Sequence, residues 1–252
     1  MTTTPLLNVK GLTKAYGALT VTDQVDLQVL AGECHAVIGP NGAGKTTLVH
    51  QLAGSLTSDA GSIFFDDIDV TRLTMAQRVH RGIARSFQIT TLLPGFSVLE
   101  NVALAVQARS GSSFRFFSSA ARERDLNDAA MAALSRVRLA DRAARRAGDL
   151  SHGEKRQLEI AVALATEAKL LLLDEPLAGT GREESAALVQ LLSELKATHT
   201  LLLVEHDMEV VFGLADRISV LTEGRLIATG TPAEIRENAV VRAAYLGDEG
   251  PA

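Results

Sequence analysis

The chain has 252 residues, of which 46% are hydrophobic and 22% are charged, and its formal net charge is −5 at pH 7. The hydrophobic content allows a sizeable core, and the acidic balance argues against a general affinity for nucleic acid. No apolar run approaches the roughly 20 residues of a membrane-spanning helix, and we expect neither a signal peptide nor a membrane span. Cys34 is the only cysteine, which excludes an internal disulfide and favours a reducing compartment; we expect its thiol to be buried and inert.

The N-terminal part of the chain is typical of β structure. Apolar residues between turn signals predict strands at 6–12 and 21–30, and a third strand at 36–38. Residues 61–70 are expected to form a hairpin with its turn at Asp66 and Asp67. A solvated turn is favoured there over a metal site, because acidic residues favour turns for local reasons.

Residues 74–88 are expected to form a short helix and then a strand. Thr74 is a suitable N-cap and Gly82 a suitable helix end, and the strand at 83–87 leads to Gln88.

Residues 89 to about 150 predict an inserted helical subdomain. The spacing of Ser97 and Glu100 is that of a capping box, which predicts a helix to about residue 109, and a second helix is expected at 120–137. The phenylalanine-rich segment 114–117 is either a partner contact or a segment that folds onto this subdomain. The arginines of 136–146 are interpreted as a solvated face rather than a contact with a membrane or acidic partner.

The C-terminal part predicts a βαβ unit of a parallel sheet. An apolar strand at 170–173 is followed by Asp174 and Glu175; a helix at 182–197 leads to a second apolar strand at 200–205, which precedes His206. A hairpin at 217–230 and a helix that starts after Thr231 are expected to complete the chain.

Residues 39–47, GPNGAGKTT, fit the P-loop pattern G-x-x-x-x-G-K-[ST] between a predicted strand and helix. Glycines allow successive backbone N–H groups to surround a phosphate, and the helix N-terminus adds unpaired donors. Lys45 is expected to reach the β- and γ-phosphates, and the Thr46 hydroxyl to ligate Mg²⁺. Nucleotide binding is accordingly assigned to Gly39, Asn41, Gly42, Gly44, Lys45, Thr46 and Thr47.

Further polar residues follow predicted strands and would meet the P-loop at one edge of a parallel sheet. Asp174 is expected to hold Mg²⁺ through its water shell, and Glu175 to polarise the attacking water. Gln88 is expected to contact Mg²⁺ or this water, and His206 to bridge the γ-phosphate and the water. A single histidine of this kind is more often structural, so this assignment depends on the strands being neighbours.

A second helix start, at Ser151, carries the spacing of a capping box with Glu154. The same exposed N–H groups and hydroxyl also suit an anion. Because the P-loop already accounts for the phosphates, the second site suggests that another subunit completes the nucleotide site.

Taken together, these motifs resemble the nucleotide-binding subunit of ABC transporters over essentially the whole chain. Residues 39–47 resemble its Walker A motif, 170–175 its Walker B motif and 150–154 its signature, while Gln88 and His206 match the Q-loop and the switch histidine. Tyr16, which by itself is better explained as a packed turn residue, matches the aromatic that stacks on adenine. The implied fold is a single α/β P-loop NTPase domain over residues 1–252, with an N-terminal antiparallel β subdomain, a RecA-like core (1–88 and 151–252) and a helical subdomain (about 89–150).

The resemblance implies ATP and Mg²⁺ as ligands and a head-to-tail dimer with a second ATPase subunit, a copy or a paralogue. Each ATP would lie between one P-loop and Ser151, Gly153 and Glu154 of the other subunit. It further implies transmembrane permease subunits that dock near Gln88 and the helical insertion, a location at the cytoplasmic face of the inner membrane, and an indirect periplasmic substrate-binding partner. No nucleic-acid partner is expected.

Two segments depart from the common pattern. The signature has His152 and Glu154 where glycine and glutamine are commonest, which leaves its hydroxyl and N–H donors in place. Gly181 falls where many members have an aspartate, so the sequence does not settle whether this loop communicates across the dimer.

Within the family, 84–88, 97–102, 205–208, 230–235 and 244–247 resemble importers for branched-chain amino acids and related amides, and specifically the LivG-like ATPase subunit. The alternatives are another ABC system, for urea or lipopolysaccharide, or a soluble ABC ATPase of a repair, translation or cluster-assembly complex. A single P-loop and the absence of a long coiled-coil pattern favour the transporter, and Ser151–Glu154 with His206 disfavours a P-loop kinase or GTPase.

Overall fold

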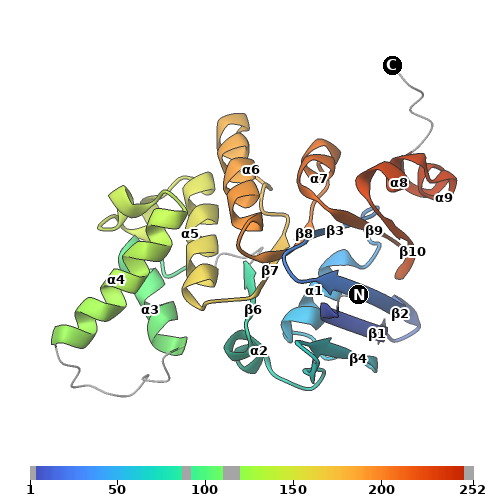
Figure 1. Cartoon of the computed structure of the whole chain (residues 1–252), viewed down its shortest axis with the longest axis horizontal. Coiled ribbons are helices and arrows are strands. Elements are labelled where there is room, and N and C mark those ends of the chain that lie inside the picture. Colours follow the sequence, from blue (N-terminus) through green and yellow to red (C-terminus); the bar gives the residue numbers. More distant parts are fainter. Residues whose placement is uncertain (1–3, 87–91, 110–119, 247–252) are drawn as a thin grey trace.

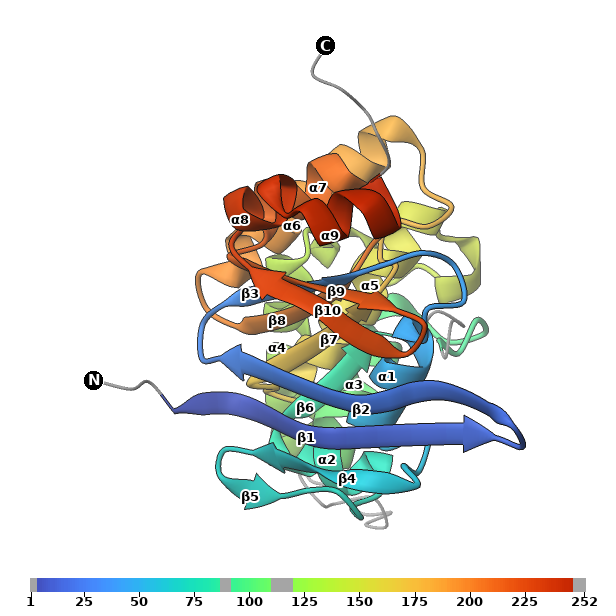
Figure 2. The ribbon, with the colours of Figure 1, turned by 90° about the vertical axis from the view of Figure 1, so that its right-hand side faces the viewer.

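The structure is a computed structural model that describes residues 4–86, 92–109 and 120–246, the side chains of 86, 120–123 and 245–246 excepted. Two β-sheets and the helices around them make up the described part of the chain (Figure 1). One sheet has four strands in the order β2-β1-β4-β5, and the other has six in the order β10-β9-β3-β8-β7-β6 (Figure 2).

The four-stranded sheet is antiparallel and comes from the N-terminal part of the chain. Its strands are β1 (Pro5–Tyr16), β2 (Leu19–Leu30), β4 (Ala60–Phe65) and β5 (Ile68–Asp69). Phe65 pairs with Ile68 across the turn at Asp66 and Asp67, as the sequence predicts. The strands alternate buried and exposed residues, because only one face of this sheet is covered.

The six-stranded sheet is largely parallel. Its strands are β3 (Cys34–Ile38), β6 (Ile83–Ser86), β7 (Leu170–Asp174), β8 (Thr200–Val204), β9 (Arg217–Thr222) and β10 (Arg225–Gly230). Only β10 is antiparallel to its neighbour, in the expected hairpin with β9. Every residue of β3, β7 and β8 is buried, because helices or the other sheet cover both faces, and this explains the uninterrupted apolar runs.

Helix α1 (Lys45–Ala53) lies between the two sheets. Leu48 and Leu52 pack in one cluster with inward residues of the antiparallel sheet, such as Leu7, and with Leu172 and Leu202 of the parallel sheet. The P-loop helix is therefore fixed from two sides.

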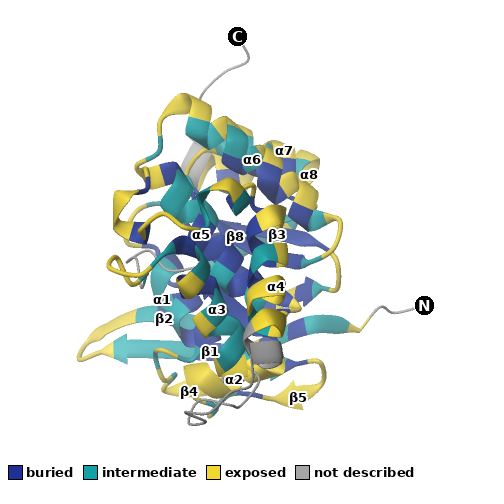
Figure 3. Ribbon diagram, turned by 90° about the vertical axis from the view of Figure 1, so that its left-hand side faces the viewer, coloured by how far each residue is buried: buried dark blue, intermediate teal, exposed yellow. Residues whose placement is uncertain are grey.

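The remaining long helices are α3 (Val98–Arg109), α4 (Ala120–Arg136), α5 (His152–Ala165) and α6 (Arg182–Lys196). They lie on the opposite side of the parallel sheet, where α5 and α6 are next to the sheet and α3 and α4 pack against α5 (Figure 1). Leu171 and Leu203 share a core cluster with residues of α3, α4, α5 and α6. Helix α4 is largely exposed on its outer side (Figure 3). The sequence predicts that the arginines of 136–146 form a solvated face. Two of them, Arg138 and Arg142, also form ion pairs with Glu194 and Glu154 of the same chain.

Short helices complete the described chain. These are α2 (Met75–Arg81), α7 (Met208–Leu214), α8 (Pro232–Glu237), α9 (Ala239–Val241), the 3₁₀ turns η1 (Ala140–Arg142) and η2 (Ala147–Asp149), and the last turn η3 (Arg242–Leu246). The N-cap expected at Thr74 is present, as part of a capping box with Gln77, and so is the capping box expected at Ser97; Gly82 ends α2 at φ 103°. Helix α7, capped by Asp207, is not predicted from the sequence.

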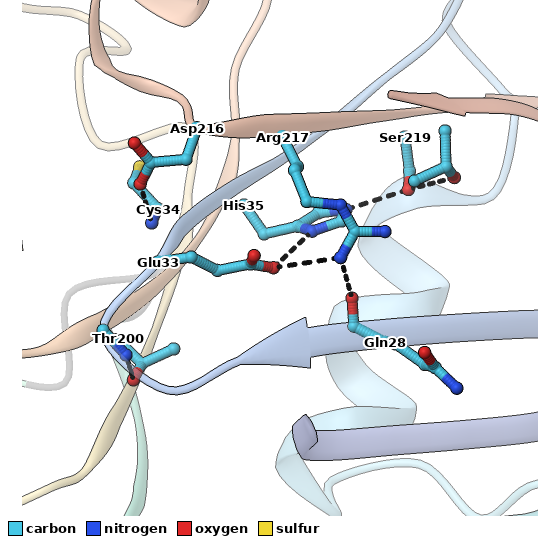
Figure 4. Close-up of polar contacts among 10 residues, drawn as sticks. Gln28, Glu33, Cys34, His35, Thr200, Asp216, Arg217 and Ser219 are labelled. Atoms are coloured by element: carbon cyan, nitrogen blue, oxygen red, sulfur yellow. Dashed lines mark hydrogen bonds and ion pairs between the residues drawn. The ribbon is translucent and has the colours of Figure 1, made fainter. Parts of the chain in front are cut away.

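Strand β3 is tied to its neighbours by a buried polar network at its start (Figure 4). His35 lies between Oε1 of Glu33, 2.9 Å from Nδ1, and Oγ of Ser219, 2.8 Å from Nε2. Arg217 also contacts Glu33, so β2, β3 and β9 are joined below the P-loop. Cys34 is buried as expected, and burial raises the pKa of its thiol to about 12.

Candidate functional site

The P-loop connects β3 to α1, and two of its glycines are required by close contacts. A Cβ on Gly39 would lie 1.9 Å from the carbonyl oxygen of Leu221, and one on Gly44 would lie 2.3 Å from that of Val21. Gly42 also has a positive φ, of 81°, but open space surrounds its Cβ position. The loop thus passes closer to β2 and β9 than a side chain allows.

Lys45 folds back over this loop. Its Nζ donates hydrogen bonds to the carbonyl oxygens of Gly39, at 2.7 Å, and Pro40, at 2.9 Å. Burial lowers the pKa of Lys45, while the nearby carboxylates of Glu175 and Asp174 oppose that shift. The ammonium group therefore lies in the loop where a phosphate would be surrounded by N–H groups, with two acidic groups close enough to act on it.

The strand order brings together the predicted site residues that the structure describes. β3 pairs in parallel with β8, β8 with β7, and β7 with β6, so the carboxyl ends of four strands meet at one edge. The condition on which the assignments to Asp174, Glu175 and His206 depended is met. Gln88 lies outside the described residues, and its role stays a prediction.

Asp174 ends β7 as a buried carboxylate. Its Oδ2 accepts a hydrogen bond from Nη2 of Arg85 at 2.9 Å, while its buried Oδ1 has no hydrogen-bond partner within the described parts of the chain. Burial raises the pKa of Asp174, and the Arg85 guanidinium opposes the shift. A buried oxygen of this kind suits a cation or a water bound to one.

The donor set fits Mg²⁺ better than a cation that needs several protein ligands. The described residues contain no group of three or more His, Cys, Asp or Glu side chains that could hold a metal ion. Mg²⁺ is commonly held by one or two protein oxygens together with waters and substrate phosphates. Asp174 and Thr46, at the end of β7 and the start of α1, are such a pair.

Glu175 and His206 are in direct contact. Oε1 of Glu175 lies 2.5 Å from Nε2 of His206, and the Glu175 backbone N–H donates to the carbonyl oxygen of Val204 at 2.8 Å. Glu175 has a φ of 49°, which turns the chain away from β7 directly after Asp174. The two side chains predicted as separate contributors therefore form one unit.

Glu205 is a residue of this edge that the sequence interpretation did not single out. It is buried, and its carboxylate accepts hydrogen bonds from the backbone N–H groups of Leu177, at 2.9 Å, and His206, at 3.0 Å. Burial raises the pKa of Glu205, and these hydrogen bonds oppose the shift. It joins the segment after Glu175 to the segment of His206; its signal in the sequence is an acidic residue at the end of an apolar strand, as for Asp174.

The predicted second anion site lies at the N-terminus of α5. The Glu154 N–H donates to Oγ of Ser151 at 3.2 Å, and the Ser151 N–H donates to Oε2 of Glu154 at 2.9 Å, so the capping box is present. A capping box accounts for two of the groups at this helix start and leaves further N–H groups for an anion. The binding role of Ser151, Gly153 and Glu154 stays a prediction.

Tyr16 ends β1 with 53% of its surface exposed, which does not fit a packed turn residue. Nζ of Lys14 lies 5.6 Å from the centre of its ring. An exposed ring of this kind is free to stack on a planar ligand.

The family model described as ABC transporter matches residues 22–178, more than half of the chain. The chain belongs to the ABC transporter family. A second model, described as branched-chain amino acid ATP-binding cassette transporter, matches residues 225–251 of this ABC protein.

Curated relatives match the ABC protein over nearly its whole length. The high-affinity branched-chain amino acid transport ATP-binding protein LivG of Escherichia coli K12 is 39% identical, with 97% of this chain and 98% of LivG covered. BraF of Pseudomonas aeruginosa, a protein with the same description, is 37% identical with the same coverage. The lipopolysaccharide export system ATP-binding protein LptB of E. coli K12 is 34% identical, with 96% and 98% covered.

Solved structures agree with the fold. The ADP conformation of MJ1267, an ATP-binding cassette of an ABC transporter, superposes with a TM-score of 0.84 at 28% identity, with 98% of this chain and all of MJ1267 covered. A nucleotide-free ATP-binding cassette from an ABC transporter gives 0.83 at 28% identity, with 97% and 100% covered.

Proposed function

We propose that this ABC ATPase powers the import of branched-chain or other hydrophobic amino acids, or of related small organic acids or amides. The observation that carries the proposal is the arrangement of Asp174 and the Glu175–His206 pair at the same sheet edge as Lys45 of the P-loop. The amino-acid cargo is supported by the 37–39% identity to LivG and BraF along the whole chain.

The roles of the side chains follow from their positions. The P-loop N–H groups and Lys45 bind the phosphates, and Tyr16 stacks on the base. Thr46 and Asp174 would hold Mg²⁺, which would supply charge neutralisation for the triphosphate. Glu175 orients and polarises the attacking water, and His206 keeps the Glu175 carboxylate in place.

A second ATPase subunit completes the site. The N-terminus of α5, with Ser151 and the N–H of Gly153, would face the γ-phosphate bound by the P-loop of the other subunit. Nucleotide binding then closes the dimer and hydrolysis opens it. The γ-phosphate shifts the equilibrium because it binds the closed conformation more strongly than the open one.

A cavity of about 300 Å³ between α2, α3 and α5 is the proposed contact for the permease subunits. Its walls are mainly apolar, with Met75, Val79, Ala105 and Val162 among them, and the buried carboxylate of Glu159 is part of its lining. Such a surface suits an amphipathic helix of a partner. The helices of the described residues include none that is long and apolar enough to cross a bilayer, so the proposal assigns the membrane path to separate subunits.

This assembly would lie at the cytoplasmic face of the inner membrane, with a periplasmic substrate-binding protein as an indirect partner and no nucleic acid involved. The test is recovery of a tagged Glu175→Gln variant from gently solubilised membranes of its native host, followed by mass spectrometry. Two multi-span permeases and a second ATPase would support the importer. The Lys45→Ala variant is the control that shows whether their recovery depends on bound nucleotide. Recovery of lipopolysaccharide-export components, or of soluble partners only, would contradict it.

A further inference from the structure

Glu184, in the first turn of α6, lies directly over the start of α5. A Cβ built on Gly153 would lie 2.8 Å from both Cβ and Cδ of Glu184 and 2.9 Å from its Cγ. The side chain of Glu184 therefore fills the space above the Gly153 backbone. No residue larger than glycine fits at position 153 while Glu184 keeps this position.

The carboxylate of Glu184 lies at the N-terminus of α5, against Gly153. Hydrogen bonding from the Ser151 side chain is the largest cause that lowers the pKa of Glu184. The backbone N–H groups of Gly181 and Gly153 and the imidazole of His152 lower it further. An ionised carboxylate thus lies where a helix start offers a hydroxyl, backbone N–H groups that have no partner within the helix, and a positive dipole end.

These are the groups that the proposed dimer assigns to the γ-phosphate of the opposite subunit. Ser151 and Gly153 cannot donate to the Glu184 carboxylate and to a phosphate with the same hydrogens. Two anions at one helix start also repel each other. The carboxylate and the phosphate therefore exclude each other from these donors.

We propose that Glu184 is an intramolecular competitor of the partner's ATP: it occupies the signature of the free subunit, and the γ-phosphate must displace it for the dimer to close. This inference depends on the proposed head-to-tail dimer. Glu184 would raise the ATP concentration that closure requires, and would prevent other anions from occupying the signature before a partner arrives.

Displacement would also be transmitted to the loop between β7 and α6. Oε2 of Glu184 lies 3.4 Å from the N–H of Gly181, which begins α6 and has no side chain to serve as a cap. His152 lies beside Gly179 of the same loop, with its Cδ2 4.0 Å from the Cβ position of that glycine. When Glu184 moves, this loop, which begins at Glu175, loses a contact at its far end.

The experiment measures ATP-dependent dimer formation in a Glu175→Gln background, which slows turnover. The dimer partner is the copy or the paralogue recovered with the membranes, and the fraction of dimer is followed by analytical ultracentrifugation over an ATP titration. Glu184→Gln keeps the size of the side chain and removes its charge. Glu183→Gln, at the exposed neighbouring position of the same helix turn, is the control with the same change in net charge.

We expect Glu184→Gln to lower the ATP concentration at half-dimerisation by about two- to fivefold, the effect of one charge at a helix terminus. Glu183→Gln should leave it unchanged, and the affinity of the monomer for ATP should be the same in all three proteins. An unchanged or higher midpoint for Glu184→Gln overturns the inference, as does a matching shift with Glu183→Gln. If the Glu175→Gln parent forms no dimer at saturating ATP, the proposed dimer itself fails.

Discussion

Nε2 of His206 lies 2.5 Å from Oε1 of Glu175, so the second residue after β8 contacts the first residue after β7. Glu205 supports the same arrangement, because its buried carboxylate accepts hydrogen bonds from the backbone N–H groups of both Leu177 and His206. The position of the proposed base thus depends on two neighbouring strands. A carboxylate fixed in this way needs little reorganisation when a water is to be polarised.

Glu175→Gln should bind ATP but hydrolyse it at least about 100-fold more slowly, because an amide cannot act as a general base. The measurements are nucleotide affinity by calorimetry and phosphate release at saturating ATP. His206→Ala is the companion variant: it leaves the carboxylate in place but unsupported, and should lower turnover less than Glu175→Gln does. Near wild-type turnover of Glu175→Gln would exclude this residue as the base.

Tyr16→Ala should weaken ATP binding by about 1 kcal/mol, or about fivefold, if the exposed ring stacks on the base. Tyr16→Phe keeps the ring and is the matched control, expected within about twofold of the wild type. Titration with a fluorescent ATP analogue measures both. Equal affinities for the alanine variant and the wild type would assign the exposed Tyr16 no part in nucleotide binding.

Two of the three P-loop glycines, Gly39 and Gly42, should respond differently to alanine. Gly39→Ala places a Cβ 1.9 Å from the Leu221 carbonyl oxygen and should cost about 3 kcal/mol or more of the free energy of unfolding. Gly42→Ala meets open space, so the strain of a positive φ alone should cost about 1 kcal/mol. Urea unfolding of the nucleotide-free proteins tests the difference, and equal losses would contradict the close approach of β9 to the loop.

Glu159 should make stability depend on pH. Burial raises the pKa of Glu159 above its ordinary value of 4.5, against the opposing effect of Arg156. Its stabilising contribution is therefore fully present below pH 4.5 and is lost as the pH rises through the raised pKa of the folded state. Glu159→Gln does not titrate, so its stability relative to the wild type should increase over this range.

Chemical unfolding of both proteins from pH 4 to pH 8 measures the effect, with Glu183→Gln as the control for net charge. Parallel stability curves for the wild type and Glu159→Gln would show that the carboxylate is not desolvated in the folded protein. The same variant can then be tested for permease capture, since Glu159 lines the proposed docking cavity.

Local chemistry in the sequence determined most of the elements and the identity of the site. The P-loop spacing, the capping boxes at Thr74, Ser97 and Ser151, and the apolar runs of β7 and β8 each depend on residues that are close in the chain. Such signals are read without knowledge of the fold. The roles assigned to the site residues, Gln88 included, and the domain boundaries at 88 and 150 remain predictions.

Only the tertiary structure decided which distant groups meet. The 2.5 Å contact between Glu175 and His206, the burial of Glu205, and the position of Glu184 over Gly153 come from strand order and helix packing. No sequence spacing specifies them, because they depend on which strands are neighbours and how closely two backbones approach. The sequence thus determined which chemistry this ABC protein carries, while the packing of β7, β8, α5 and α6 decided how its charged groups are held before nucleotide arrives.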